Sequence, residues 1–111
     1  MSSGIGKAKI RIPRSIQAGD TVEVKALIRH PMETGLRKNK KTKEKIPAHY
    51  IDEVTVEFRN ETVLVADWGA AVAKDPFFSF FLQVDGPGVL KITWKDNKGE
   101  VYSKTTEVTV K

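Results

Sequence analysis

Apolar and polar residues alternate along most of this 111-residue chain, and this period of two constrains its fold more than any other feature. In a β-strand successive side chains point to opposite faces, so such alternation gives one apolar face and one polar face. The clearest alternating segments are residues 8–12, 22–28, 54–58, 90–94 and 102–110. Residues 62–68 and 77–84 are two further candidates, and the sequence therefore predicts about seven strands.

Turn-forming residues separate the predicted strands. Pro13 cannot donate to a strand ladder, and Arg59-Asn60-Glu61 is a candidate tight hairpin. We expect only one short helix, at Gly69–Lys74, ended by Pro76. Many short strands without alternating helices predict an all-β antiparallel sandwich. The core is expected to hold alternate apolar residues, among them Val22, Val24, Val54, Val56, Phe80, Leu90, Ile92 and Trp94.

The length suits one domain, which we place at residues 7–111 after a flexible tail at residues 1–6. No apolar stretch approaches the roughly 18 residues that a membrane span needs, so no membrane insertion is expected. The N-terminus also lacks the apolar segment of a signal peptide.

The chain has no cysteine, which excludes a disulfide framework, a cysteine-ligated metal and a cysteine nucleophile within it.

The positive charge is concentrated in one segment. The chain has a formal net charge of +5, and the run Arg37–Lys45 holds six basic residues and one acidic residue. The rest of the chain balances, so we expect the basic character to belong to this segment and not to a face of the molecule. The run lies in a long loop from about His30 to Ala48. We expect residues 30–37 to be ordered and residues 39–45 to be mobile, because the lysines repel one another.

No catalytic motif is present, and we predict neither a catalytic centre nor a cofactor. His30 and His49 bracket the long loop and could meet at one end of the sandwich, with Glu33 or Asp52 nearby, to bind a metal. The alternative is that the histidines bond to loop backbone or lie in an interface, and we predict that no metal is bound. Nucleic-acid binding is not expected, because the basic run contains no aromatic residue for base stacking.

The segment 77–84 carries phenylalanines on both of its faces. Phe78 and Phe80 suit the core, whereas Phe77 and Phe81 have the opposite parity and would face outward. Either the Gly69–Lys74 segment covers these two rings or another chain does. We expect a second chain, so Phe77 and Phe81 are predicted partner-binding residues.

Several segments resemble the SoxZ family of sulfur-oxidation carrier subunits. The most specific is His30-Pro31-Met32-Glu33-Thr34-Gly35 with Arg37-Lys38, followed by Ile46-Pro47-Ala48-His49-Tyr50-Ile51. The resemblance extends to Lys7–Ile10, Ala18-Gly19, Asp75–Phe80 and Trp94–Asp96 and covers about residues 7–111. The segment Asn39–Lys45 departs from it, because the family usually has an Asp- and Gly-containing turn there.

The resemblance implies an immunoglobulin-like sandwich that pairs with SoxY in a SoxYZ heterodimer for thiosulfate oxidation. SoxY would carry the sulfur on a cysteine of its C-terminal arm, while other Sox enzymes act on this cargo in turn. This chain would then be a non-catalytic subunit, exported to the periplasm with its signal-bearing partner. The loop residues expected to contact the partner are His30, Pro31, Met32, Glu33 and Arg37.

Two other functions remain open at this stage. The chain could be a stand-alone β-sandwich that binds an acidic protein or ligand through its basic loop. It could also be an enzyme that uses the end of the sandwich where His30 and His49 lie.

Overall fold

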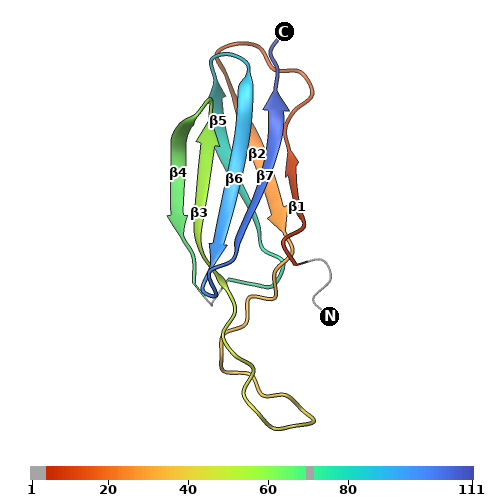
Figure 1. Ribbon diagram of the computed structural model, residues 1–111. Helices are drawn as coiled ribbons and strands as arrows, with labels where there is room; N and C mark the ends of the chain where they lie inside the picture. Colours follow the sequence, from red (N-terminus) through yellow and green to blue (C-terminus); the bar gives the residue numbers. More distant parts are fainter. Residues whose placement is uncertain (1–4, 70–71) are drawn as a thin grey trace.

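The computed structural model describes residues 5–69 and 72–111, and this part of the chain is all-β. Figure 1 shows seven strands: β1 (Ala8–Arg11), β2 (Asp20–Ile28), β3 (Ile51–Phe58), β4 (Glu61–Asp67), β5 (Phe77–Val84), β6 (Gly88–Asp96) and β7 (Val101–Val108). The predicted fold class and strand number are confirmed. Among the described residues no helix is long and apolar enough to cross a membrane.

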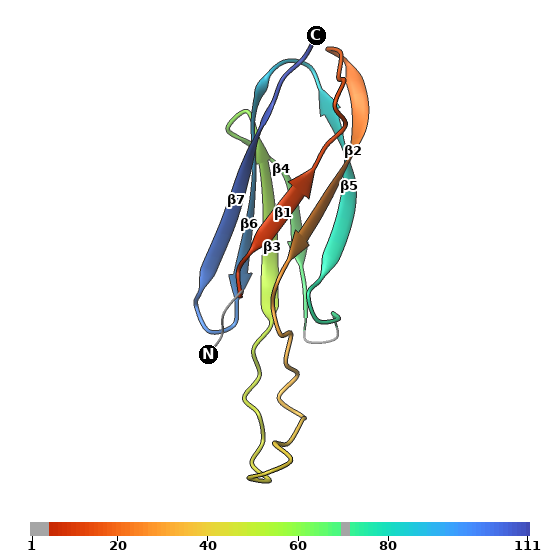
Figure 2. The same ribbon diagram turned by 90° about the vertical axis from the view of Figure 1, so that its right-hand side faces the viewer.

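The strands form two antiparallel sheets packed face to face (Figure 2). One sheet has the order β1-β2-β5 and the other the order β4-β3-β6-β7. Strand β1 contacts β7 across one side of the sandwich, and β4 and β5 are edge strands. Each sheet has one face in the core and one in solvent, which explains the alternation in the sequence.

The core lies between the two sheets and is built from alternate residues of their strands. Seven of the eight predicted core residues are buried there, and Trp94 is fully enclosed. Phe80 is only partly buried, but it packs against the core and stacks on Phe78. The core prediction is therefore confirmed, with Phe80 at its margin.

The turns follow the predicted residues. Arg59 and Asn60 form the two-residue β3–β4 loop with φ values of 54° and 66°, as a type I′ hairpin requires. The helix expected at Gly69–Lys74 falls partly on residues 70–71, outside the described residues, and its described flanks are not helical. The expected tail at residues 1–6 likewise falls mostly outside them, but the Gly6 amide already donates to the Arg29 carbonyl.

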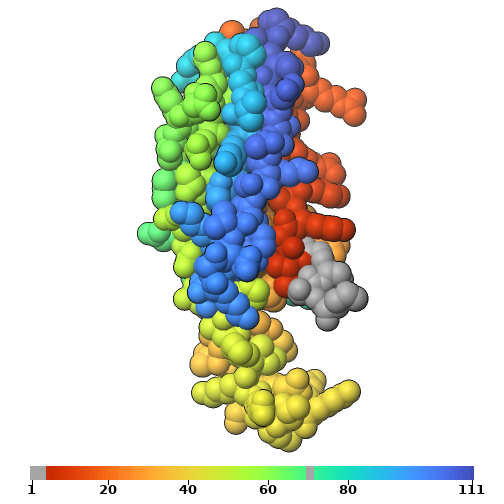
Figure 3. Space-filling view, viewed as in Figure 1, coloured from red at the N-terminus to blue at the C-terminus, as the bar shows by residue number. Residues whose placement is uncertain are grey.

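The connection between β2 and β3 projects from one end of the sandwich as a two-legged extension, residues 31–48, which we call the arm (Figures 1 and 3). Its legs pair where Glu33 and His49 exchange backbone hydrogen bonds, and again where Lys38 bridges Lys45. The arm makes the molecule elongated, with extents of 57 × 21 × 18 Å. The predicted loop is therefore a paired ribbon in the structure, and the mobility of residues 39–45 stays a prediction.

Candidate interaction surfaces and a buried histidine cluster

The outer face of the three-stranded sheet carries an exposed apolar stripe. Phe77 and Phe81 lie on this face with 60% and 74% of their surfaces exposed. The backbone register places Leu27 opposite Phe77 and adds a third apolar side chain to the stripe. No described segment covers the two rings, and this includes residues 69 and 72–74, the described part of the segment expected to cover them. Trp68, just before that segment, packs edge-on against Phe78 on the inner side instead.

The same outer face is basic, which corrects the expectation that only the loop carries net positive charge. Its exposed side chains include five cations and a single acid. The cations are Lys7, Lys9, Arg11, Lys25 and Arg29, and the acid is Glu23. Outside the run Arg37–Lys45 the acidic and basic residues are equal in number, but the acidic residues lie mostly on the other sheet. The sequence alone therefore does not reveal this basic face. Three of these cations, Lys9, Arg11 and Lys25, line an open hollow together with Leu27 and Phe77.

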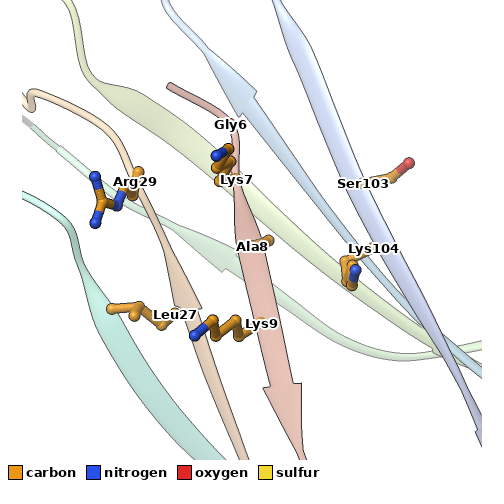
Figure 4. A pocket seen from close by; sticks show the side chains of 8 residues that line it. All are labelled: Gly6, Lys7, Ala8, Lys9, Leu27, Arg29, Ser103 and Lys104. Carbon is orange, nitrogen blue, oxygen red and sulfur yellow. The ribbon is translucent and has the colours of Figure 1, made fainter. Parts of the chain in front are cut away.

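A second group of cations lines a groove beside β1. Figure 4 shows Lys7, Lys9, Arg29 and Lys104 around it, with Lys104 contributed by β7. Arg29 and Ser103 point in opposite directions, away from the groove centre (Figure 4). Because the charged groups do not converge on one point, the groove is not a built anion site.

His30 and His49 do meet at the root of the arm, as their bracketing positions suggested. Their ring centroids are 4.4 Å apart. Their shared partner is the buried carboxylate of Asp96, at the end of β6, and not the predicted Glu33 or Asp52. The Nε2 atoms of His30 and His49 lie 3.2 and 2.8 Å from Asp96 Oδ2.

Three further donors complete the environment of Asp96. The Tyr102 hydroxyl donates to Oδ2 at 2.9 Å, and the amides of Lys98 and Glu100 donate to Oδ1 at 3.0 Å. We call His30, His49, Asp96 and Tyr102 the root cluster. Five hydrogen bonds converge on one carboxylate, which satisfies the requirement that a buried charge be fully paired.

The protonation states follow from burial and bonding. Burial alone would raise the pKa of Asp96, but the hydrogen bonds from His30, Tyr102, the Glu100 amide and His49 hold that pKa well below its usual range. Burial lowers the pKa of His30, and its bond to Asp96 opposes this only in part. Burial and the neighbouring Asp96 raise the pKa of the Tyr102 hydroxyl. At neutral pH the cluster thus holds an anionic Asp96, a neutral His30 and a protonated Tyr102.

The root cluster could bind a metal ion on distance alone, because His30, His49 and Asp96 offer ligand atoms within 4.8 Å of one another. The amide of Met32 donates to His30 Nδ1 at 3.2 Å, so Nδ1 presents its lone pair and Nε2 carries the proton. A metal on Nε2 would move that proton to Nδ1, where it would face the Met32 N–H. His30 therefore fits a hydrogen-bond donor better than a ligand, and the absence of a bound metal stays a prediction.

The predicted loop residues divide into two that are buried and three that reach the surface to different degrees. His30 and Met32 are buried within this chain, where the Met32 sulfur accepts the Ile51 amide at 3.4 Å. Neither side chain presents a surface to a partner in this structure, so both position the loop instead. Pro31, Glu33 and Arg37 line an open hollow on the arm, and Arg37 pairs with Glu33 through two hydrogen bonds.

The root cluster lies next to the apolar stripe. The His30 amide donates to Asp75 Oδ1 at 3.0 Å, and the Asp75 amide donates to the His30 carbonyl at 2.9 Å. Strand β5 starts two residues later, at Phe77. The loop residues that reach the surface, Pro31, Glu33 and Arg37, therefore follow a segment that is bonded to the start of the stripe.

The sequence of this chain matches a known protein family over most of its length. The family model of the sulphur oxidation protein SoxZ matches residues 10–107. The chain belongs to the SoxZ family. This membership gives it a role in the Sox system of sulfur oxidation. No curated protein matches the chain significantly.

Solved structures support the fold. The sulfur carrier protein SoxY from Chlorobium limicola f thiosulfatophilum is similar with a TM-score of 0.65 and 16% identity, over 98% of this chain and 76% of SoxY. A superoxide reductase (neelaredoxin) from Ignicoccus hospitalis has a TM-score of 0.69 and 18% identity, over 95% of this chain and 80% of its own. The superoxide reductase from Nanoarchaeum equitans has a TM-score of 0.66 and 12% identity, over 97% and 96%. At these identities the likeness shows the immunoglobulin-like sandwich fold alone.

Proposed function

We propose that this SoxZ-family chain is the non-catalytic subunit of a SoxYZ sulfur-carrier heterodimer in thiosulfate oxidation. In this role a cysteine on the C-terminal arm of SoxY holds the sulfur intermediates, and this chain supports and presents its partner. The chain has no cysteine of its own on which to hold sulfur. The proposal also places the chain in the periplasm, exported together with SoxY.

The observation that carries the proposal is the exposed stripe of Phe77 and Phe81. Burial of one phenylalanine is worth roughly 1.5–3 kcal/mol, so two rings left in water forgo a large stabilisation unless a partner covers them. Aromatic side chains of this kind commonly dominate the binding energy of an interface. We assign the partner contact to Phe77 and Phe81, extended by the neighbouring Pro31, Glu33 and Arg37 on the arm.

Co-expression with the SoxY of the same organism tests the proposal. We expect a 1:1 complex by size-exclusion chromatography and native mass spectrometry. The complex should be required for thiosulfate consumption by the other Sox enzymes. A chain that stays monomeric beside folded SoxY, or that supports no thiosulfate consumption in the complex, would contradict the proposal and favour a stand-alone binding module.

A further inference from the structure

The tip of the arm, residues 38–45, carries a net positive charge that no ion pair among the described residues neutralises. It holds five lysines and one acid, Glu44, within eight residues. Among the described residues none of these lysines forms an ion pair, whereas Arg37 at the edge of the tip is bonded to Glu33. All eight residues are exposed. Like charges held this close repel one another, so the tip costs stability in the isolated chain.

The tip nevertheless has a defined backbone. The Ile46 amide donates to the Arg37 carbonyl, and the Asn39 amide donates to the Glu44 carbonyl, each at 2.8 Å. The Asn39 side chain closes the turn, because its Oδ1 accepts the amides of Lys41 and Thr42. The lysines are therefore displayed by a hydrogen-bonded ribbon.

The base of the ribbon is also attached to the sandwich by hydrogen bonds. Its two legs leave the sandwich at His30 and His49, and both histidines bond to the buried Asp96. The arm places its tip beyond the end of the sandwich, clear of both sheets (Figures 1 and 2). A fully paired buried polar cluster thus holds an arm whose tip, residues 38–45, adds nothing to the apolar core.

From this combination we infer that the arm tip is a docking element for acidic patches on the enzymes that act on the SoxY-bound sulfur. The inference rests on the proposed function, because it assumes that the chain travels with a carrier that several enzymes must engage. Complementary charge at the rim of a contact raises the rate of encounter and fixes orientation without demanding a tight complex. This suits a carrier that must leave each enzyme after every step.

The composition of the arm favours a protein surface over a nucleic acid. The arm has no aromatic residue on which a base could stack. It does have Leu36, which is 79% exposed beside the lysines and offers an apolar anchor to a protein patch. Glu44 would oppose a phosphate backbone but can pair with a basic residue at the rim of an acidic patch.

The test uses the assembled heterodimer with K40Q, K41Q and K45Q introduced together in this chain. Each Sox enzyme of the same organism is purified, and thiosulfate consumption is measured as the heterodimer concentration is varied. We expect the apparent KM for the heterodimer to rise at least about tenfold while kcat is unchanged. The strong increase of KM with salt that the unmodified heterodimer should show is expected to be largely lost.

The matched control removes the same charge elsewhere, with K91Q, K104Q and K111Q, all at exposed positions of the sandwich and C-terminal segment. It should leave KM within about twofold. Equal KM values for the two triple variants would overturn the inference while the heterodimer itself stands. Loss of heterodimer in the tip variant would also overturn it, since the tip would then bind SoxY.

Two other outcomes are informative. Tight binding of a fluorescent DNA duplex at 150 mM salt, lost in the tip variant, would assign the tip to nucleic acid and overturn the inference. Failure of the unmodified chain to form a heterodimer would remove the proposed function and the inference together. That failure is seen before any kinetic measurement, so the two are distinguished.

Discussion

At the scale of single residues, Asp96 determines how the arm is attached. Its carboxylate is inaccessible to solvent and accepts five hydrogen bonds, three from the side chains of His30, His49 and Tyr102 and two from backbone amides of the turn that follows it. Removal of one partner from a buried charged cluster is costly, because the remaining groups lose water and receive nothing in exchange. Asp96 is thus the residue on which both legs of the arm depend.

We expect Asp96→Asn to lower the free energy of unfolding by about 3 kcal/mol. The variant replaces one acceptor oxygen with a donor, so an amide hydrogen must face either the ring nitrogens of His30 and His49 or the backbone amides of the turn. Urea denaturation at pH 7 measures the change. Asp85→Asn, at an exposed turn position, is the control and should stay within about 0.5 kcal/mol. Equal stability of the two variants would contradict a role of Asp96 in stability.

The lowered pKa of His30 leads us to expect that the free energy of unfolding depends on pH. Its pKa is lowered in the fold, so below about pH 6.5 the unfolded chain binds a proton that the folded chain resists. The free energy of unfolding should therefore fall as the pH drops from about 6.5 to 5. Because the pKa of Asp96 is also lowered, a second decline should begin near pH 4.

Urea titrations between pH 3.5 and 8 measure both declines. His30→Gln is less stable at pH 7 but should lack the first decline, because glutamine does not titrate. A wild-type curve that is flat from pH 7.5 to 5 would contradict the assignment of a neutral, buried His30.

The root cluster was only half predictable at this scale. The histidines were identified because they bracket the loop, and Asp96 could have been found from parity, since it continues the inward series Leu90, Ile92 and Trp94. A charged residue in such a series indicates a buried, paired carboxylate. The parity of Tyr102 was also known, but its contact with Asp96 depends on the turn between β6 and β7. Only the folded chain brings those groups to the arm root.

At the scale of secondary-structure elements, β5 carries aromatic side chains on both of its faces. Phe78 faces inward, between Trp68 and Phe80, whereas Phe81 lies 74% exposed on the outer face. The strand is an edge strand, so its outer face is also the part of the sheet that a second chain can reach most easily. Two substitutions three residues apart should therefore have opposite consequences.

We expect Phe81→Ser to weaken capture of SoxY while it changes the free energy of unfolding of the isolated chain by no more than about 0.5 kcal/mol. Phe78→Ser should lower that free energy by about 2 kcal/mol, since it opens a gap beside Trp68. Pull-down and thermal denaturation of both variants measure the contrast. A large stability loss in Phe81→Ser with SoxY capture intact would place its ring in the core of this chain.

The strands were predictable and the arm was not, for one physical reason. Strand prediction depends on the alternation that a half-buried sheet imposes, and β1, β2, β3 and β6 all show it. The arm beyond Met32 buries no apolar face, so its pairing comes from backbone hydrogen bonds such as that between Ile46 and Arg37, which leave no pattern in the sequence. The pairing of the arm was therefore not predicted, whereas the mobility of residues 39–45, expected from their mutual repulsion, stays a prediction.

At the scale of the whole molecule, charge is sorted between surfaces. The outer face of the four-stranded sheet carries more acids than bases: Glu53, Glu57, Asp67 and Glu107 against Lys91 and Lys95. The opposite outer face and the arm are both basic. The total charge was readable from the sequence, but this separation was not, because it depends on which strands share a sheet.

We expect replacement of residues 38–45 by Asn-Gly to leave the sandwich intact. Arg37 and Ile46 already bond across the ribbon, and Asn-Gly favours the tight turn that would join them. The free energy of unfolding should change by less than about 1 kcal/mol, since the tip contributes nothing to the core. Small-angle scattering should show a shorter maximum dimension than the elongated parent, and a loss of cooperative unfolding would contradict the independence of the tip.

The root cluster also has a consequence for the order of folding events. Its members come from four places along the chain, and the contact between His30 and Asp96 spans 66 residues. Contacts of such long range form only after the intervening chain has been organised, so the two sheets must assemble before the cluster closes. The Asp96→Asn chain should therefore refold at nearly the normal speed and unfold much faster. The cluster thus slows unfolding without speeding folding, and it sets how long the arm stays attached once the sandwich has formed.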